Sequence, residues 1–238
     1  MEKYENAFFI EKYVALWAYG YQNGIGTSEG LYRTINELGF SCFDNNVAAE
    51  VLDVGCGVGR TTADYAKFFR NAKVTGIDSA KLMIDMANRL HFSNETAILD
   101  MNRLGFGVMR LQGIKLQNVR FLNIGLEDFS LEEQRGRFDI VTAVNLLDRT
   151  VDIKQDIARI FQLLKQKGIF IIATPLNFST SEHWKKYGSF ESLLALVREV
   201  GFYVDVAFDK FPYQEILDVR GAVEEYQTIV MRLIKPMK

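Results

Sequence analysis

Apolar and polar residues follow two different rhythms along this chain. At its start, apolar residues recur at helical spacing over residues 7–21 and 28–39, which predicts two helices. Thr27 and Ser28 are suited to cap the second helix, and Gly39 lies near its end. The segment between the helices is polar and rich in glycine, so we expect a loop with room to move.

From residue 49 onward, short apolar runs alternate with amphipathic stretches. The runs predict strands at residues 50–54, 73–77, 119–124, 138–144 and 168–174, and the stretches predict helices at 60–69, from Ser79 onward, 153–164 and 190–200. This alternation is typical of an α/β fold with a parallel sheet and helices on both faces. The last two runs, 202–208 and 227–234, have no clear long helix between them and predict an antiparallel edge pair.

Residues 93–118 interrupt this rhythm, because they are longer than the usual link between elements. We interpret them as an inserted helix that either covers a site or packs on one edge of the sheet. The expected organisation is therefore a helical cap or lid over residues 1–44 and a main domain over residues 45–238 that carries the insertion.

Composition and charge then narrow the functional classes. Of the 238 residues, 48% are hydrophobic and 24% charged, and the net charge is −2, so no global field attracts nucleic acid or anionic lipid. We find no apolar run of membrane-spanning length and no signal peptide, and we expect a cytoplasmic protein that binds neither nucleic acid nor membrane. With two histidines and two cysteines, the composition argues against a structural zinc site or disulfide. The oligomeric state is not indicated.

The stretch VLDVGCGVGR places Gly55, Gly57 and Gly59 between a predicted strand and the helix that follows it. Glycines allow positive φ and close approach of a ligand to the backbone, and a helix start presents unpaired N–H groups. The spacing is G-x-G-x-G, whereas dinucleotide sites favour G-x-G-x-x-G. A nucleoside without a diphosphate, such as S-adenosylmethionine, fits this turn, and Asp53 could meet its ammonium group directly or through water.

Asp78 ends the next predicted strand, where an acid can accept hydrogen bonds from both hydroxyls of a ribose. Its alternative role is to cap the helix that follows. Asp53 likewise has a structural alternative as a cap of the turn, although an acid in an apolar strand needs a partner.

Five stretches, in order, resemble the class I S-adenosylmethionine-dependent methyltransferase family: VLDVGCGVGRTT, VTGIDSAKLMIDMA, FLNIGLEDF, FDIVTAVNLLDR and GIFIIATP. The resemblance covers roughly residues 45–238. It implies a Rossmann-like fold with seven strands, of which the last is antiparallel. It also implies S-adenosylmethionine as the cofactor and methyl transfer as the activity.

The resemblance assigns residues to the parts of the cofactor. It places the turn residues Asp53, Gly55, Cys56, Gly57, Gly59 and Arg60 around the methionine part, Asp78 on the ribose, and Ser79 and Ala80 beside the adenine. In the loop after the third strand, this chain has Gly125 where the family often has an acid, which leaves the adenine contacts to Leu126 and Glu127. Glu127 and Asp128 have the alternative of a solvated loop. Asn145 would face the cofactor near its sulfonium.

The acceptor is expected over the end of the fourth strand, at NLLDR. Asp148 and Arg149 could bind opposite ends of a zwitterionic small molecule, or they could form an ion pair that orders the loop. NLLDR also resembles the corresponding segment of methyltransferases acting on histidine-derived imidazoles, such as the mercaptohistidine enzymes of ovothiol synthesis. His183 lies in the polar, aromatic loop after the fifth strand and is either a base or a solvated side chain.

These observations favour an enzyme that methylates nitrogen or oxygen of a small molecule by in-line transfer. Aromatic residues of the first helix, among them Tyr13 and Trp17, either pack that helix or line a substrate box. A non-catalytic domain that binds the cofactor or a partner is the alternative of another class. A nicotinamide oxidoreductase is disfavoured by the glycine spacing.

Overall fold

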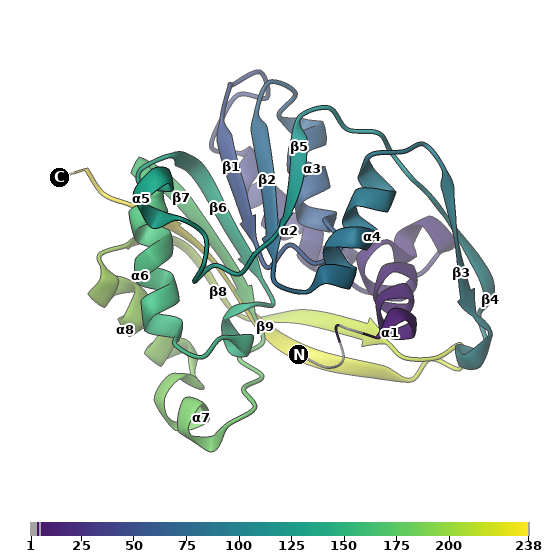
Figure 1. Cartoon of the computed structure of the whole chain (residues 1–238). Coiled ribbons are helices and arrows are strands. Elements are labelled where there is room, and N and C mark those ends of the chain that lie inside the picture. Colours follow the sequence, from purple (N-terminus) through teal and green to yellow (C-terminus); the bar gives the residue numbers. More distant parts are fainter. Residues whose placement is uncertain (1–3, 5, 238) are drawn as a thin grey trace.

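The computed structural model describes Tyr4 and residues 6–237. One seven-stranded sheet runs through the molecule in the order β5-β2-β1-β6-β7-β9-β8 (Figure 1). Five strands are parallel, and β9 runs antiparallel between β7 and β8. The predicted Rossmann-like sheet with an antiparallel last strand is therefore confirmed. The strands are β1 (Glu50–Val54), β2 (Lys73–Asp78), β5 (Val119–Asn123), β6 (Phe138–Val144), β7 (Leu164–Thr174), β8 (Tyr203–Ile216) and β9 (Val223–Ile234).

Helices cover both faces of the sheet. Neighbouring residues of a strand point to opposite faces, and in β1 Val51 joins the core under one set of helices while Leu52 joins the core under the other. The first set is α2 (Glu29–Phe40), α3 (Arg60–Phe68) and α4 (Lys81–His91), and the second is α6 (Ile153–Leu163) and α8 (Phe190–Val200). A short helix, α5 (Leu131–Gln134), precedes β6.

The N-terminal segment before α2 is helical throughout most of its length. It consists of α1 (Ala7–Lys12), a π-helical turn η2 (Tyr13–Ala18) and a 3-10 turn η3 (Gly20–Asn23). This agrees with the predicted helices at 7–21 and 28–39. Ser28 does precede α2, but its hydroxyl donates to the carbonyl of Trp17 instead of capping the helix.

The predicted inserted helix at residues 93–118 is wrong. The segment forms a two-stranded hairpin, β3 (Thr96–Met101) and β4 (Gly107–Gln112), joined by the 3-10 turn η4 (Asn102–Leu104). Its residues alternate strictly between buried and exposed, as in β3, where Ala97, Leu99 and Met101 are buried. Ile98 and Val108 are apolar yet more than half exposed, which hides the alternation in the sequence.

A third and smaller core joins this hairpin to the N-terminal helices. It contains Val14 and Trp17 of η2, Leu99 of β3 and Leu111 of β4, and it also includes residues of α4. Figure 1 shows α1, β3 and β4 together at one side of the molecule, where the tip of β8 and β9 reaches them. The hairpin thus supports the N-terminal helices beside the glycine turn, whose Val58 belongs to the same core.

Two further segments differ from the prediction. The polar loop after β7 contains a short helix, α7 (Ser181–Tyr187), which begins where the Thr180 hydroxyl accepts the amide hydrogen of His183. Strands β8 and β9 are longer than the predicted 202–208 and 227–234. None of the described helices is long and apolar enough to span a bilayer.

Candidate active site

The glycine turn lies between β1 and α3. Gly55, Gly57 and Gly59 have φ values of 68°, 53° and 79°, a region in which a side chain is strained. A Cβ on Gly55 would lie 2.7 Å from Leu146, and one on Gly59 would lie 2.6 Å from Phe121. Outside its chain neighbours, a Cβ on Gly57 would meet nothing closer than 3.7 Å. Packing therefore requires the outer two glycines, whereas the middle one presents open backbone.

Asp78 joins the glycine turn to the start of α4. Its Oδ2 accepts the amide hydrogen of Gly57 at 2.9 Å, and its Oδ1 accepts that of Ala80 at 2.8 Å. The second bond is the helix-capping role, and each carboxylate oxygen can accept a further bond. Burial raises the pKa of Asp78, and the two backbone hydrogen bonds lower it. Asn123, which the sequence reasoning missed, donates to the carbonyls of Asp78 and Ser79.

Asp53 is buried between three elements. Its carboxylate oxygens accept hydrogen bonds from the hydroxyls of Thr62 in α3 and Thr142 in β6, both at 2.6 Å. Burial raises the pKa of Asp53 to about 6, although both hydroxyls oppose that shift. The carboxylate therefore has the partners that an acid in an apolar strand needs. Its contact with an ammonium group stays a prediction.

Cys56 is 8% exposed and fills space beside the turn, since a Cβ on Gly76 would lie 2.9 Å from its sulfur. Burial raises the pKa of its thiol, and a protonated thiol is a poor nucleophile. This agrees with the interpretation of Cys56 as a small loop residue. Contact between Cys56 and a cofactor stays a prediction.

The loop after β5 divides its residues between core and solvent. Leu126 is 6% exposed and packs in the core under α6 and α8. Glu127 is exposed and folds back, so that a Cβ on Gly125 would lie 2.7 Å from its carboxyl group. The loop lies next to Ser79 through Asn123. The adenine contacts of Leu126, Glu127 and Ser79 stay predictions.

Asn145 follows β6 with a positive φ of 53°, which is uncommon for a residue with a side chain. Its amide donates to the carbonyl of Ala173 at 2.7 Å and so continues the pairing of β6 with β7. Its Oδ1 atom is buried and has no hydrogen-bond partner among the described residues. A buried acceptor without a donor is costly, so this atom is suited to a donor on a bound ligand.

Asp148 and Arg149 form an ion pair of 3.6 Å in the turn η5 (Leu147–Arg149). The Asp148 side chain is fully buried and also accepts the amide hydrogen of Asn177 at 3.2 Å. These contacts are those of the structural alternative, in which the pair orders the loop. Arg149 is about one third exposed and is the more accessible of the two.

His183 lies on α7, apart from the glycine turn. Its ring contacts Phe178 and Tyr187, with centroid distances of 5.6 and 6.2 Å. Both neighbours belong to the core under α6 and α8, and Figure 1 shows α7 below α6 at the far side of the sheet from α4. The structure therefore does not bring His183 together with Gly57 and Asp78, and its role as a base stays a prediction.

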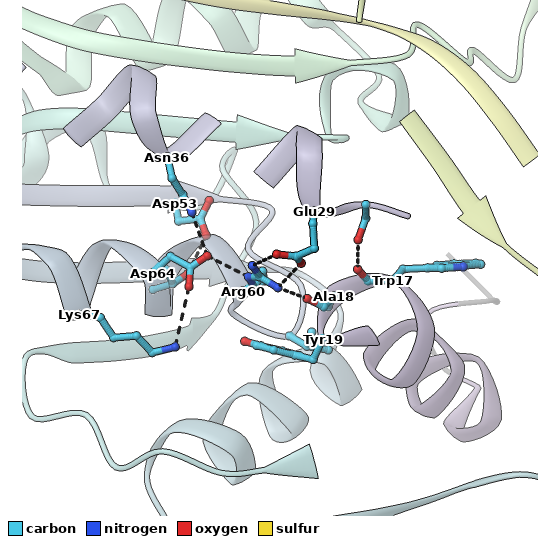
Figure 2. A network of polar contacts seen from close by, with 12 residues as sticks. Trp17, Ala18, Tyr19, Glu29, Asn36, Asp53, Arg60, Asp64 and Lys67 are labelled. Atoms are coloured by element: carbon cyan, nitrogen blue, oxygen red, sulfur yellow. Dashed lines mark hydrogen bonds and ion pairs between the residues drawn. The ribbon is translucent and has the colours of Figure 1, made fainter. Parts of the chain in front are cut away.

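Arg60 connects the N-terminal segment to α3 (Figure 2). Its guanidinium donates to Asp64 at 2.8 Å, to Glu29 at 3.1 Å and to the carbonyl of Ala18. The ring of Tyr21 lies 4.5 Å from its central carbon. With these partners, Arg60 anchors the segment that approaches the glycine turn, while its predicted contact with a cofactor is untested.

A small cavity remains between the N-terminal segment and the glycine turn. Tyr13, Tyr32, Asp53, Gly55 and Arg60 are among its lining residues, and its volume is about 10 Å³, enough for roughly one water molecule. The hydroxyl of Tyr13 is the atom closest to the open side of Gly57. A ligand on the turn therefore requires the Tyr13 ring to move.

A larger hollow of about 420 Å³ lies at the opposite end of the sheet, where Gly136, Leu164 and Lys165 line it. These residues flank the amino ends of β6 and β7. Ligands of open α/β sheets bind outside the carboxyl ends of the strands. The glycine turn, Asp78 and Asn145 all lie at carboxyl ends, so we place the candidate active site there.

A family model described as a methyltransferase domain matches residues 45–221, which is most of the chain. The glycine turn and Asp78 lie within this match. The chain therefore belongs to the class I S-adenosylmethionine-dependent methyltransferases, as the sequence resemblance implied, and S-adenosylmethionine is the cofactor of this family.

Two curated relatives and one solved structure illustrate the similarity. Trans-aconitate 2-methyltransferase of Deinococcus radiodurans is 26% identical over 74% of this chain and 59% of its own length. A ubiquinone biosynthesis O-methyltransferase of Pseudoalteromonas translucida is 29% identical over 63% of this chain and 53% of its own length. The YcgJ protein of Bacillus subtilis shares the fold with a TM-score of 0.58 at 15% identity, covering 87% of this chain and all of that one. The chain thus spans little more than half the length of these two relatives.

Proposed function

We propose that this protein transfers the methyl group of S-adenosylmethionine to a small molecule that binds at the carboxyl ends of β6 and β7. The observation that carries the proposal is the bond between the Asp78 carboxylate and the Gly57 amide. It fixes an acid beside an open stretch of backbone at the crossing of β1 and β2. A nucleoside with an amino-acid tail needs both features within its own length.

The residues present fit the cofactor chemically. The open backbone at Gly57 accommodates the methionine part, and Asp78 can accept the ribose hydroxyls beside its two amide bonds. The buried Oδ1 of Asn145 lacks a donor among the described residues, and the ammonium group of the cofactor is one. When bound, S-adenosylmethionine supplies a methyl group activated by its sulfonium.

The remaining task of the protein is to position the acceptor. In-line displacement requires the acceptor atom, the methyl carbon and the sulfur to be aligned, and holding this geometry accelerates the reaction by several orders of magnitude. Asn145 and the turn η5 with Arg149 follow β6, beside the expected position of the methyl group. The N-terminal segment with Tyr13 covers the same place and would exclude water from the reaction.

The small volume of the cavity favours one alternative function. With about 10 Å³ beside the turn, the chain could be a methyltransferase-like domain that keeps the fold without turnover. In that case Tyr13 would stay on the glycine turn, and the surface around it would serve a partner. The two functions differ in whether the protein binds the cofactor.

Calorimetric titration with S-adenosylhomocysteine, on protein stripped of bound ligand, tests the proposal. We expect a dissociation constant on the order of micromolar, with NAD binding at least about 100-fold more weakly because the turn lacks the dinucleotide spacing. Binding of neither ligand would support the non-catalytic alternative. Tighter binding of NAD would support an oxidoreductase.

A further inference from the structure

The hairpin of β8 and β9 extends beyond the carboxyl edge of the sheet. The last pair that β9 forms with β7 is Ile229 with Thr174, whereas β8 and β9 stay paired as far as Ile216 with Val223. Figure 1 shows the overhang in yellow, reaching toward α1 and the β3–β4 hairpin. Its tip is held there, because Trp17 donates to the carbonyl of Ile216 at 2.8 Å. The overhang thus forms one wall beside the glycine turn.

Five tyrosines gather between this wall, α2 and the N-terminal segment. Tyr213 and Tyr226 are directly opposite each other on β8 and β9, with ring centroids 5.7 Å apart. Tyr13 and Tyr32 share a hydrogen bond and line the cavity beside Gly55. We name the tyrosine cluster by its members, Tyr4, Tyr13, Tyr32, Tyr213 and Tyr226.

Glu215 provides the negative charge of this cluster. Its Oε1 accepts a hydrogen bond from the Tyr213 hydroxyl at 2.6 Å, and its charge acts on all five tyrosines. Glu224 lies directly opposite Glu215 and accepts the hydroxyl of Tyr226 at 2.9 Å. Like charges opposite each other in a sheet repel. Two acids among aromatic faces therefore favour a cation between them.

Arg149 lies at one side of the same space. Its positive charge acts on Tyr4 and Tyr226, and its side chain is about one third exposed. The charge of Asp78 also acts on Tyr4, so the cluster adjoins the cofactor half of the site. Asp148, by contrast, is buried beneath Arg149 and holds the amide of Asn177. Glu215 is thus the acid that faces the tyrosines.

We infer that the tyrosine cluster and Glu215 form the acceptor subsite, that the acceptor is an amine, and that the reaction is therefore N-methylation. This inference rests on the proposed function. The ammonium form of the amine binds beside Glu215, with the tyrosine faces around it. Arg149 is positioned to bind an acidic group elsewhere on the same molecule.

The bonds and protons of the reaction balance as follows. The amine loses one proton to the Glu215 carboxylate and attacks with its lone pair. The new N–C bond forms as the C–S bond breaks, and the electron pair of that bond stays on sulfur, which becomes a neutral thioether. The methylated amine keeps its remaining hydrogens and takes up a proton on release. A phenolate or carboxylate acceptor would instead place a second negative charge beside Glu215.

The experiment uses the full chain saturated with S-adenosylhomocysteine and three probes of one shape: benzylamine, benzyl alcohol and benzoate. We expect benzylamine to bind at least about tenfold more tightly than either other probe, because a hydrogen bond to an ion pair is stronger than a neutral one. Glu215→Gln should abolish this preference and leave the affinity for S-adenosylhomocysteine unchanged. Glu225→Gln, on the opposite face of the same strand pair, should retain it.

Each other outcome overturns the inference. Equal or tighter binding of benzyl alcohol or benzoate to the wild type contradicts an amine site, as does the absence of benzylamine binding. Retention of the preference in Glu215→Gln contradicts the role of that residue. The comparison of probes on the wild type does not depend on how well the variant folds. If S-adenosylhomocysteine itself fails to bind, the proposed function fails instead, which the first titration shows separately.

Discussion

The two halves of the candidate site are built by different kinds of contact. The cofactor half is held by backbone hydrogen bonds and close packing within residues 53–80, as in the bonds from Gly57 and Ala80 to Asp78. The acceptor half is held by side-chain hydroxyls and rings from distant segments, and the bond from Trp17 to Ile216 spans 199 positions. The first half therefore tolerates almost no change in shape. The second can be altered one side chain at a time.

The largest effect is expected at Gly59, where a small change meets rigid packing. Gly59→Ala should lower the free energy of unfolding by about 4 kcal/mol, because φ is 79° and the new Cβ would lie 2.6 Å from the Phe121 ring. Gly221→Ala is the matched control, with φ of 88° and nothing within 4 Å, and should cost about 1 kcal/mol. Urea unfolding of both variants measures the difference. Equal losses would show that packing at the turn is not the limiting constraint.

His91 makes the cofactor half sensitive to acid. Its Nε2 atom lies 2.8 Å from the Tyr19 hydroxyl and 3.3 Å from the Val58 carbonyl, and burial lowers its pKa to about 4. Below its ordinary pKa of 6.5 the unfolded chain takes up a proton that the folded protein does not. Stability from this group is therefore fully present above pH 6.5 and falls by up to about 3 kcal/mol toward pH 4.

His91→Gln should remove this fall, so the difference in unfolding free energy between wild type and variant should shrink as the pH drops from 6.5 to 4. Asp53 acts in the opposite direction, because its raised pKa makes folding more favourable as the pH falls from 6 to 3.8. Both proteins share that contribution, and it cancels in the comparison. Parallel pH profiles would contradict the assignment to His91.

Asp78→Ala tests the cofactor half through binding. We expect the affinity for S-adenosylhomocysteine to fall about 100-fold, because the ribose loses a charged acceptor and Gly57 loses its partner. Asp85→Ala is the control, since Asp85 sits on the outside of α4 in an exposed pair with Lys81. Calorimetry on both variants gives the ratio. An unchanged affinity in Asp78→Ala would rule out the ribose contact.

The smallest effect is expected where the acceptor half covers the cofactor half. Tyr13→Ala should speed the association of S-adenosylhomocysteine by about fivefold, because the ring no longer has to leave the open side of Gly57. Tyr13→Phe retains the ring and loses only the bond to Tyr32, so it should change the rate much less. Stopped-flow fluorescence provides the rates. A similar increase in both variants would point to the hydroxyl as the constraint.

Local pattern predicted the elements that are buried on both sides. The bounds of β1, β6 and α8 agree with the prediction to the residue, because a buried strand or helix gives an uninterrupted apolar signal between polar turns. The β3–β4 hairpin was missed because Ile98 and Val108 are exposed. Helix α7 was missed because seven residues are too few to show a period.

The same contrast holds for the candidate site. Gly57 and Asp78 could be identified from the sequence, since a strand end, a glycine turn and an acid at the next strand end are local signals. Asn123, Tyr213 and Glu215 could not, because nothing near them in the sequence marks a ligand. The signal that could have indicated Tyr213 and Glu215 is their i, i+2 spacing in β8, which places them on one face.

By itself, the sequence determined the class of this protein: the parallel sheet, the glycine turn and the acid that follows β2, all set by contacts between residues close along the chain. Only the tertiary structure decided which side chains surround the acceptor. The overhang of β8 and β9, the hairpin and the N-terminal segment meet through the packing of residues far apart in the chain. Burial of apolar area has no direction, so the sequence pattern shows that these surfaces are covered without showing by what.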